Sequence, residues 1–162
     1  MSALSWLWLS ALVILLDLGT KFWVSSTLSY NDPLFVLPVF DLRLLHNTGA
    51  AFSFLAGADG WQRWLFAGIA LVVSVFILRW LRETPKSVVT LAMSYTLILG
   101  GALGNLFDRI VHGYVVDFIS VHYAGWYFPA FNIADMAITC GAMLLIYDSL
   151  FLAKKREVSK LA

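Results

Sequence analysis

Two aspartates, Asp117 and Asp135, are the residues of this chain whose type and setting best suit chemistry. Each lies beside a strongly apolar stretch, where an ionised carboxylate is costly unless it is paired or has a function. The lysine or arginine nearest to Asp117 in sequence is Arg109, eight positions before it. Two carboxyl groups in a partly dry site share one proton, so one can act as a base toward water while the other polarises a carbonyl group. The pair therefore indicates aspartic-protease chemistry, with a helix cap and a residue on a wet loop as the structural alternative.

Further polar residues gather at the same ends of the apolar stretches as these aspartates. Asp17 and Lys21 are four residues apart, so they share a helix face and are expected to form an ion pair. Asn105 and Arg109 have the same spacing, on a face that the glycines of "LGGALGNLFDR" make suitable for close helix packing. The residues that could meet the two aspartates in one layer beneath a membrane surface are Asp17, Lys21, Asn105, Asp108, Arg109 and Asn132.

Other hydrolytic mechanisms and metal sites have little support in the sequence. There is no H-E-x-x-H and no G-x-S-x-G, and His46, His112 and His122 lack the spacing of metal ligands. The single cysteine, Cys140, excludes an internal disulfide and a multi-cysteine metal site. We therefore expect neither a metal ion nor another cofactor.

The composition is typical of a chain in contact with lipid. Of the 162 residues, 60% are hydrophobic and 13% are charged, whereas a soluble domain carries about 25% charged residues. The length fits a single domain spanning residues 1–162. A net charge of +1 and the lack of a basic stripe interleaved with aromatic residues argue against nucleic-acid binding.

Four apolar stretches are long enough to cross a bilayer, which requires about 20 residues. They cover about residues 4–24, 61–81, 88–107 and 133–153. The first has no lysine or arginine before its apolar core and no small-residue cleavage site after it, so we interpret it as a retained span rather than a signal peptide. The two long connectors, residues 25–60 and 110–132, then lie on one side of the membrane.

Positive charges indicate that the opposite side is the cytoplasmic one. Seven of the eleven lysines and arginines fall in the connector "RWLRETPK" and the tail "KKREVSK". By the positive-inside rule, both termini lie in the cytoplasm and the two long connectors face outward. The candidate site is therefore expected near the outer face of a multi-pass membrane protein.

Both outward connectors contain strand-like patterns. The runs "FVLPVFDLRLL" and "YVVDFISV" are rich in β-branched and aromatic residues, and Pro38 should lie at a sheet edge or a bulge. The run "AAFSFLAG", residues 50–57, is expected to form a short interfacial helix. The predicted fold is an all-α membrane protein, a bundle of four transmembrane helices with a small extracytoplasmic antiparallel β-sheet and that short helix.

Five motifs together resemble one family, the bacterial lipoprotein signal peptidases, also called signal peptidase II. "DLGTK" (residues 17–21) is similar to the family's first-span motif, and "HNTGAAFS" (46–53) to its Asn-x-Gly-Ala-Ala-Phe segment. "GGALGNLFDR" (100–109) is similar to its third-span motif. "VVDF" (115–118) and "FNIAD" (131–135) resemble its two catalytic boxes. The motifs occur in the family's order and extend through nearly the whole chain.

The resemblance implies an aspartyl endopeptidase of the bacterial inner membrane. Its implied substrates are prolipoproteins, cut just before a cysteine that carries a diacylglyceryl group, and Asp117 and Asp135 would be the catalytic pair. Membrane lipids are the other expected partner, and nothing in the sequence requires more than a monomer. The residues implied to line or support the site are Asn47, Gly49, Asn105, Arg109, Asn132, Asp17 and Lys21.

A small proton-coupled carrier or channel, with Asp17, Asp135 and Arg109 as a relay, is the alternative function. It predicts polar residues that lead right through the membrane, whereas the middles of the second and fourth stretches are almost wholly apolar. A non-catalytic assembly scaffold is a third hypothesis, and it would not require paired carboxylates.

Overall fold

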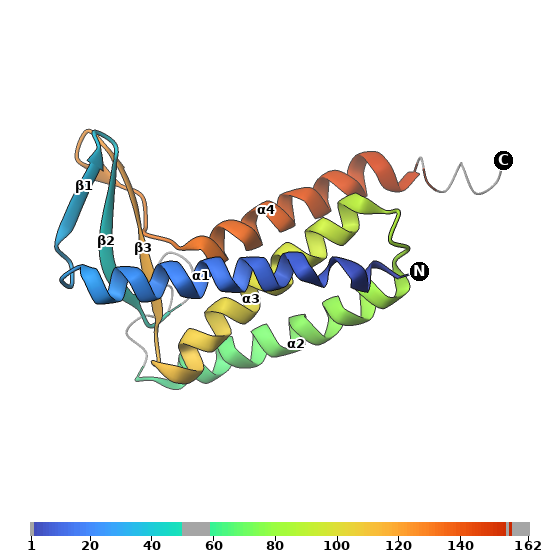
Figure 1. Cartoon of the computed structure of the whole chain (residues 1–162), viewed down its shortest axis with the longest axis horizontal. Coiled ribbons are helices and arrows are strands. Elements are labelled where there is room, and N and C mark those ends of the chain that lie inside the picture. Colours follow the sequence, from blue (N-terminus) through green and yellow to red (C-terminus); the bar gives the residue numbers. More distant parts are fainter. Residues whose placement is uncertain (1, 50–58, 155, 157–162) are drawn as a thin grey trace.

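The chain folds into four long helices with a small sheet at one end of them (Figure 1). The computed structural model describes residues 2–49, 59–154 and 156. The helices are α1 (Leu7–Thr27), α2 (Trp61–Glu83), α3 (Val89–Val111) and α4 (Ile133–Tyr147). A short 3₁₀ turn, η1 (Ala3–Trp6), precedes α1, and a π-helical segment, η3 (Asp148–Leu152), continues α4.

All four helices, with η1 counted in the first and η3 in the last, are long and apolar enough to cross a membrane. Large apolar side chains point outward from them, including Leu15 at 71% and Phe22 at 77% exposure, as expected of surfaces that contact lipid. The central helix is α3, because 56% of its apolar segment is buried, against 17–22% in the other three. It packs against α1, α2 and α4.

Glycines allow α3 to approach its neighbours closely. Gly100 faces Val13 of α1, and Gly101 faces the backbone of Ala134 in α4, so a Cβ atom at either position would overlap the neighbouring helix. Gly141 of α4 is equally close to Ile98 of α3. Small residues are what permit such backbone contact in membrane bundles, so the glycine-rich stretch of the sequence sets the spacing of three helices.

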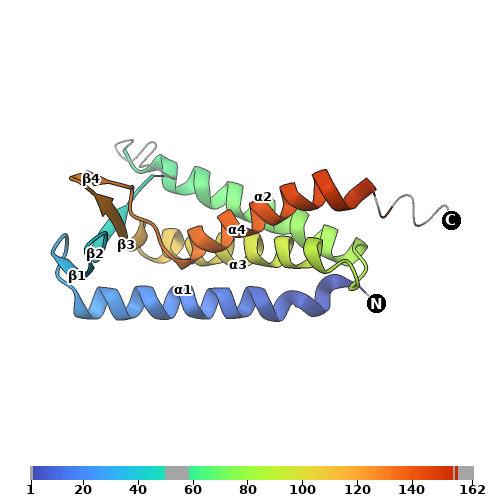
Figure 2. The ribbon, with the colours of Figure 1, turned by 90° about the horizontal axis from the view of Figure 1, so that it is seen from above.

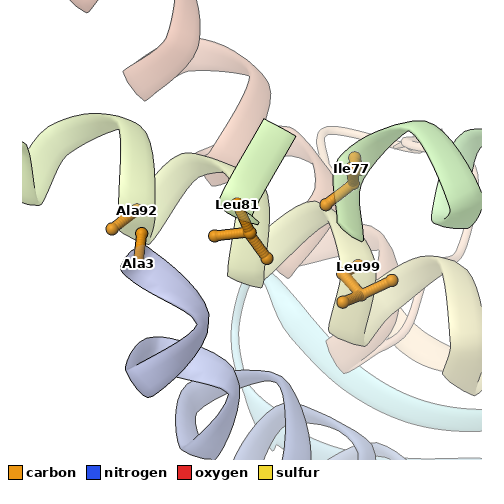
Figure 3. Packing of buried hydrophobic residues seen from close by; sticks show 5 residues of the cluster. All are labelled: Ala3, Ile77, Leu81, Ala92 and Leu99. Atoms are coloured by element: carbon orange, nitrogen blue, oxygen red, sulfur yellow. The ribbon is translucent and has the colours of Figure 1, made fainter. Parts of the chain in front are cut away.

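The end of the bundle farthest from the sheet has an apolar core. Ala3 packs against Ala92 there, while Ile77 and Leu81 of α2 face Leu99 of α3 (Figure 3). All five side chains are almost completely buried. This end therefore closes the bundle without charged groups in that cluster.

The sheet has four antiparallel strands in the order β1-β2-β3-β4. They are β1 (Pro33–Leu37), β2 (Phe40–Asn47), β3 (Val115–Tyr123) and β4 (Trp126–Tyr127). Figure 2 shows the sheet across the ends of the helices, near the start of α4. The two long connectors thus pair with each other through β2 and β3, which brings the segments before α2 and after α3 side by side.

The predicted fold class is confirmed, with two corrections of detail. Pro38 lies in the turn between β1 and β2 rather than at an edge position or bulge, since its fixed φ suits a turn and it cannot donate to a ladder. The first and third helices also run past the predicted ends, to Thr27 and Val111. Polar side chains such as Lys21 and Asp108 are buried in protein, so these helices continue where their hydropathy falls. The predicted interfacial helix, residues 50–57, lies outside the described residues.

The close contact at Gly101 yields a test of the packing. Gly101→Ala should destabilise the protein by about 1–3 kcal/mol, because the added methyl group forces α3 and α4 apart. Gly68→Ala in α2 is the matched control, since no atom lies within 4 Å of the added methyl there. Thermal unfolding of both variants in detergent measures the difference, and equal melting temperatures would contradict the packing.

Candidate active site

The two aspartates lie on one cavity between the helices and the sheet. Asp117 belongs to β3 and Asp135 to the first turn of α4, and both line a cavity of about 1060 Å³. Apolar side chains of α2, α3 and α4 form one side of this cavity, and residues of β2, β3 and β4 form the other. Residues 18 positions apart in the sequence are thereby brought to the same space.

Each aspartate is positioned by the element that carries it. Asp117 pairs with Leu45 across β2 and β3, and its side chain is only 3% exposed. Asp135 lies in the first turn of α4, three residues after the N-cap residue Asn132. The Asn132 Oδ1 accepts the Asp135 backbone N–H at 2.9 Å. Asn132 is therefore the cap of α4, which leaves the Asp135 carboxylate available for the cavity.

Three asparagines hold the two carboxyl groups. Asn132 Nδ2 donates to Asp117 Oδ1 at 2.7 Å, and Asn105 Nδ2 donates to Asp135 Oδ1 at 2.8 Å. Asn132 Nδ2 also lies 3.3 Å from Asn105 Oδ1, so the two amides link one carboxyl group to the other. Asn47 Nδ2 donates to the second oxygen of Asp117 at 3.0 Å.

A buried lysine lies beneath these amides. Lys21 is 3% exposed, and its Nζ donates to Asp17 Oδ2 at 2.7 Å and to Asn105 Oδ1 at 2.9 Å. The same ammonium forms an ion pair with Asp108 Oδ2 at 3.0 Å. The predicted ion pair of Asp17 with Lys21 is thus present but incomplete, because Asp108 is a second anionic partner.

Both anionic partners of Lys21 also bind backbone near the catalytic candidates. Asp17 Oδ1 accepts the N–H of Ala134, the residue before Asp135, at 2.9 Å. Asp108 Oδ2 accepts the N–H of Val116, the residue before Asp117, at 3.0 Å. Asp108 was predicted to lie in the polar layer, but its contact with the Val116 backbone was not predicted. A hydrogen bond between a side chain and a strand backbone produces no periodic pattern in the sequence.

Arg109 lies between α3 and the loop after β2. Its Nη2 donates to the Gly49 carbonyl at 3.0 Å, and its Nη1 donates to the Asn105 carbonyl at 3.3 Å. Asn47 Oδ1 accepts the Gly49 N–H at 2.9 Å, so the loop is held from both sides. Asn47, Gly49 and Arg109, which the motifs predicted as site residues, therefore form one connected group beside Asp117.

Burial decides the protonation of Asp117. Desolvation raises the pKa of its carboxyl group from 3.8 to about 7, and the neighbouring Asp135 adds to the shift. The hydrogen bonds from Asn47 and Asn132 lower the pKa by a smaller amount. Near neutral pH, Asp117 therefore exchanges a proton readily, which general acid–base catalysis requires.

The histidines and acids do not form a metal centre within the described part of the chain. His46 stacks on Tyr114 with 3.9 Å between ring centroids, and burial lowers its pKa. The His112 ring also stacks on Tyr114, with 5.8 Å between ring centroids. Its Nδ1 lies 3.7 Å from Asp108 Oδ1. These contacts fit packing roles for both histidines.

The structure thus brings all the predicted site residues to one end of the bundle, while their roles in catalysis stay predictions. Asp108 is the supporting residue that sequence reasoning did not assign. Arg43, Ser120 and Tyr127, which line the sheet side of the cavity, were also not predicted.

Known proteins of similar sequence and structure match nearly the whole chain. The family model described as signal peptidase (SPase) II matches residues 9–151. The lipoprotein signal peptidase of Acinetobacter baumannii is 57% identical over 154 residues, which cover 94% of this chain and 87% of that protein. The lipoprotein signal peptidase of Pseudomonas fluorescens is 53% identical over 154 residues, covering 94% and 90%.

A solved structure of a bacterial membrane enzyme, determined by the in meso method, has the same arrangement. It matches with a TM-score of 0.79 and 29% sequence identity, over 92% of this chain and 94% of that chain. The matched range of the family model includes both aspartates and the asparagines that hold them. By sequence and by fold, the chain belongs to the signal peptidase II family.

Proposed function

We propose that the protein is a two-aspartate endopeptidase that removes signal peptides from prolipoproteins, cutting just before a cysteine that carries a diacylglyceryl group. The observation that carries this proposal is the pair Asp117 and Asp135 on one cavity, linked through the amides of Asn105 and Asn132. Membership of the signal peptidase II family supports the substrate class.

Hydrolysis would proceed with one proton shared between the two carboxyl groups. The ionised member takes a proton from water as the water oxygen attacks the peptide carbonyl carbon, and the protonated member donates its proton to the carbonyl oxygen. The tetrahedral intermediate then collapses: the C–N bond breaks, and the carboxyl group that gained the water proton passes it to the leaving nitrogen. The other carboxyl group, now ionised, takes a proton back from a hydroxyl of the intermediate, so a carboxylic acid forms and the pair again holds one proton. No metal is needed for this cycle, because each proton moves between a carboxyl group and the substrate.

The surrounding residues would hold the pair and the substrate. Asn105 and Asn132 fix the orientation of the carboxyl groups, and Arg109 with Asn47 keeps the Gly49 loop against the cavity. Asp17 and Lys21 would act through these residues rather than on the substrate.

The cavity chemistry fits a signal peptide. Its helix side is built from apolar residues of three membrane-spanning helices, which suits the apolar helix of a signal sequence and the acyl chains of the lipidated cysteine. The residues on this side are Phe66, Ile69, Ala70, Val73, Ile98, Ala102, Met136 and Ile138.

The proposed location is the bacterial inner membrane, with both termini in the cytoplasm and the cavity near the outer face. The charge bias of the sequence supports this orientation, since the end of α2, the α2–α3 connector and the C-terminal tail together carry seven of the eleven lysines and arginines. The start of α1 and the end of α4 lie at the end of the bundle away from the sheet (Figure 1). We propose that the protein acts as a monomer surrounded by lipid.

A proton-coupled carrier has less support from the packing. Asp17, Asp135 and Arg109 all lie at the sheet end, whereas the far end contains the apolar cluster of Ala3, Ile77 and Leu99. Cleavage of a lipidated prolipoprotein by the purified protein distinguishes the peptidase from both the carrier and a scaffold.

Replacement of either aspartate should abolish cleavage without unfolding the protein. Asp117→Asn and Asp135→Asn each remove the exchangeable proton but keep the shape of the side chain, so turnover should fall by about a thousandfold or more. The double variant should be little worse than either single one, because the pair acts as a unit. Cleavage of a lipidated prolipoprotein in detergent measures this, with melting temperature as the control. Near-normal turnover of either variant would mean that its aspartate is structural.

Activity and stability should both depend on the ionisation of Asp117. Cleavage should fall as pH rises through about 7, because Asp117 then loses the shared proton. A folded-state pKa above 3.8 means that ionising Asp117 costs folding free energy, so its contribution to stability is present below pH 3.8 and lost as pH approaches 7. Asp117→Asn should therefore gain stability relative to wild type as pH rises. A flat difference in melting temperature between pH 4 and pH 8 would contradict the raised pKa.

The orientation can be tested with single cysteines in a Cys140→Ala background. Asp32→Cys lies before β1 and Lys86→Cys lies between α2 and α3, and both positions are exposed. On intact spheroplasts, an impermeant maleimide should label position 32 at once and position 86 only after permeabilisation. The opposite labelling order would overturn the orientation and the depth of the cavity with it.

A further inference from the structure

A charged cluster lies in the sheet beside the cavity, and the proposed mechanism does not use it. Asp41 of β2 is completely buried, and neither of its carboxylate oxygens has a hydrogen-bond partner in the described chain. Arg43 Nη2 lies 3.9 Å and His122 Nε2 lies 3.4 Å from Asp41 Oδ2. The Arg43 guanidinium also lies over the ring of Tyr127, 5.4 Å from its centroid. Arg43 is thus held on two sides, and it lines the cavity.

One N–H group of the Arg43 guanidinium, that of Nε, lacks an acceptor among the described residues. The Nε atom is buried, and 3.9 Å from Nη2 to Asp41 is too long for a hydrogen bond. A buried donor left without an acceptor costs free energy, so it is a good site for a ligand that supplies one. The strand itself is irregular here, since the register of β2 against β3 shifts between Leu42 and Leu45. Such a bulge is a common way to direct a side chain toward a functional site.

The position of Arg43 relative to Asp117 indicates which part of a substrate it would contact. Leu45, the register partner of Asp117, is two residues further along β2. Two residues of an extended strand cover about 7 Å, which is also the length of two residues of an extended substrate. If the apolar signal peptide lies along the helix side, the chain beyond the scissile bond runs along the sheet side toward Arg43.

The ligand chemistry follows from the charges nearby. Asp41 compensates the charge of Arg43, and the cavity already contains Asp117 and Asp135. An acidic substrate side chain would be repelled by these carboxylates, whereas a neutral peptide carbonyl accepts a hydrogen bond from guanidinium without that repulsion. We propose that Arg43, fixed by Asp41 and Tyr127, binds a main-chain carbonyl of the mature segment about two residues beyond the scissile bond. This inference rests on the proposed function.

Two lipidated peptides with the same signal sequence test the inference. The short one ends at the diacylglyceryl cysteine as a carboxamide, and the long one continues with four alanines, so its added acceptors are main-chain carbonyls. The purified wild type should cleave the long peptide with a kcat/KM about tenfold higher, the value of one charge-assisted hydrogen bond. Arg43→Gln should cleave the two peptides with the same kcat/KM. Arg82→Gln, an exposed arginine at the far end of α2, is the matched control and should keep the preference.

A double variant separates substrate binding from a purely structural role. Arg43→Gln leaves the buried Asp41 with His122 but without its arginine neighbour, whereas Asp41→Asn/Arg43→Gln removes both charged side chains of β2 and should fold. The double variant should still lack the preference for the long peptide. Recovery of the preference would mean that Arg43 only neutralises Asp41, and this would overturn the proposal.

Two further outcomes complete the test. Equal cleavage of both peptides by the wild type would contradict the role of Arg43 but leave the peptidase intact. Failure of the wild type to cleave either peptide would contradict the proposed function itself.

Discussion

The arrangement of the site depends on one buried ammonium group. An unpaired charge in a membrane bundle costs several kcal/mol, so the burial of Lys21 requires anionic partners in a fixed place. Asp17 comes from the same helix and Asp108 from α3, and each also accepts the backbone N–H of the residue immediately before Asp135 or Asp117. One ion-pair cluster therefore connects α1, α3, the start of α4 and β3. A shift of any of these elements would leave a charge or a backbone donor unpaired.

The same ammonium determines how the amides above it are oriented. Because Lys21 donates to Asn105 Oδ1, the amide nitrogen of Asn105 is left to face Asp135. Asn132 uses its oxygen as the helix cap and its nitrogen for Asp117. Both aspartates thus receive amide donors, which favour the ionised form, while burial dominates at Asp117 and raises its pKa to about 7. The balance between these opposing effects keeps the proton of the Asp117 carboxyl group exchangeable in a cavity whose helix side is apolar.

The cavity combines two environments that no single element could provide. The helices supply an apolar side at membrane depth, and the sheet supplies backbone and polar groups outside the spans. Glycines at 100 and 101 permit the close helix packing on which this depends, because any side chain there would separate α3 from α1 and α4. The aspartates lie where the two environments meet. An apolar helix with a polar continuation is the kind of peptide that fits such a boundary.

The four spans and the strand-forming connectors could be predicted from the sequence, because hydropathy and period-two alternation are local properties. The candidate site residues could be predicted too, because a polar residue in an apolar stretch is costly, as at Asp17, Lys21 and Asp135. Which of these groups touch one another depends on the tertiary structure. The second partner of Lys21, the choice of Asn132 as the cap and the raised pKa of Asp117 depend on contacts between distant segments. The contacts of Arg43 with Asp41 and Tyr127 likewise require β2, β3 and β4 to pair in register. The sequence alone shows Arg43 as an ordinary strand residue, whereas in the structure it lines the cavity. Hydrogen bonds and desolvation arise from distances in space, which spacing along the chain does not encode.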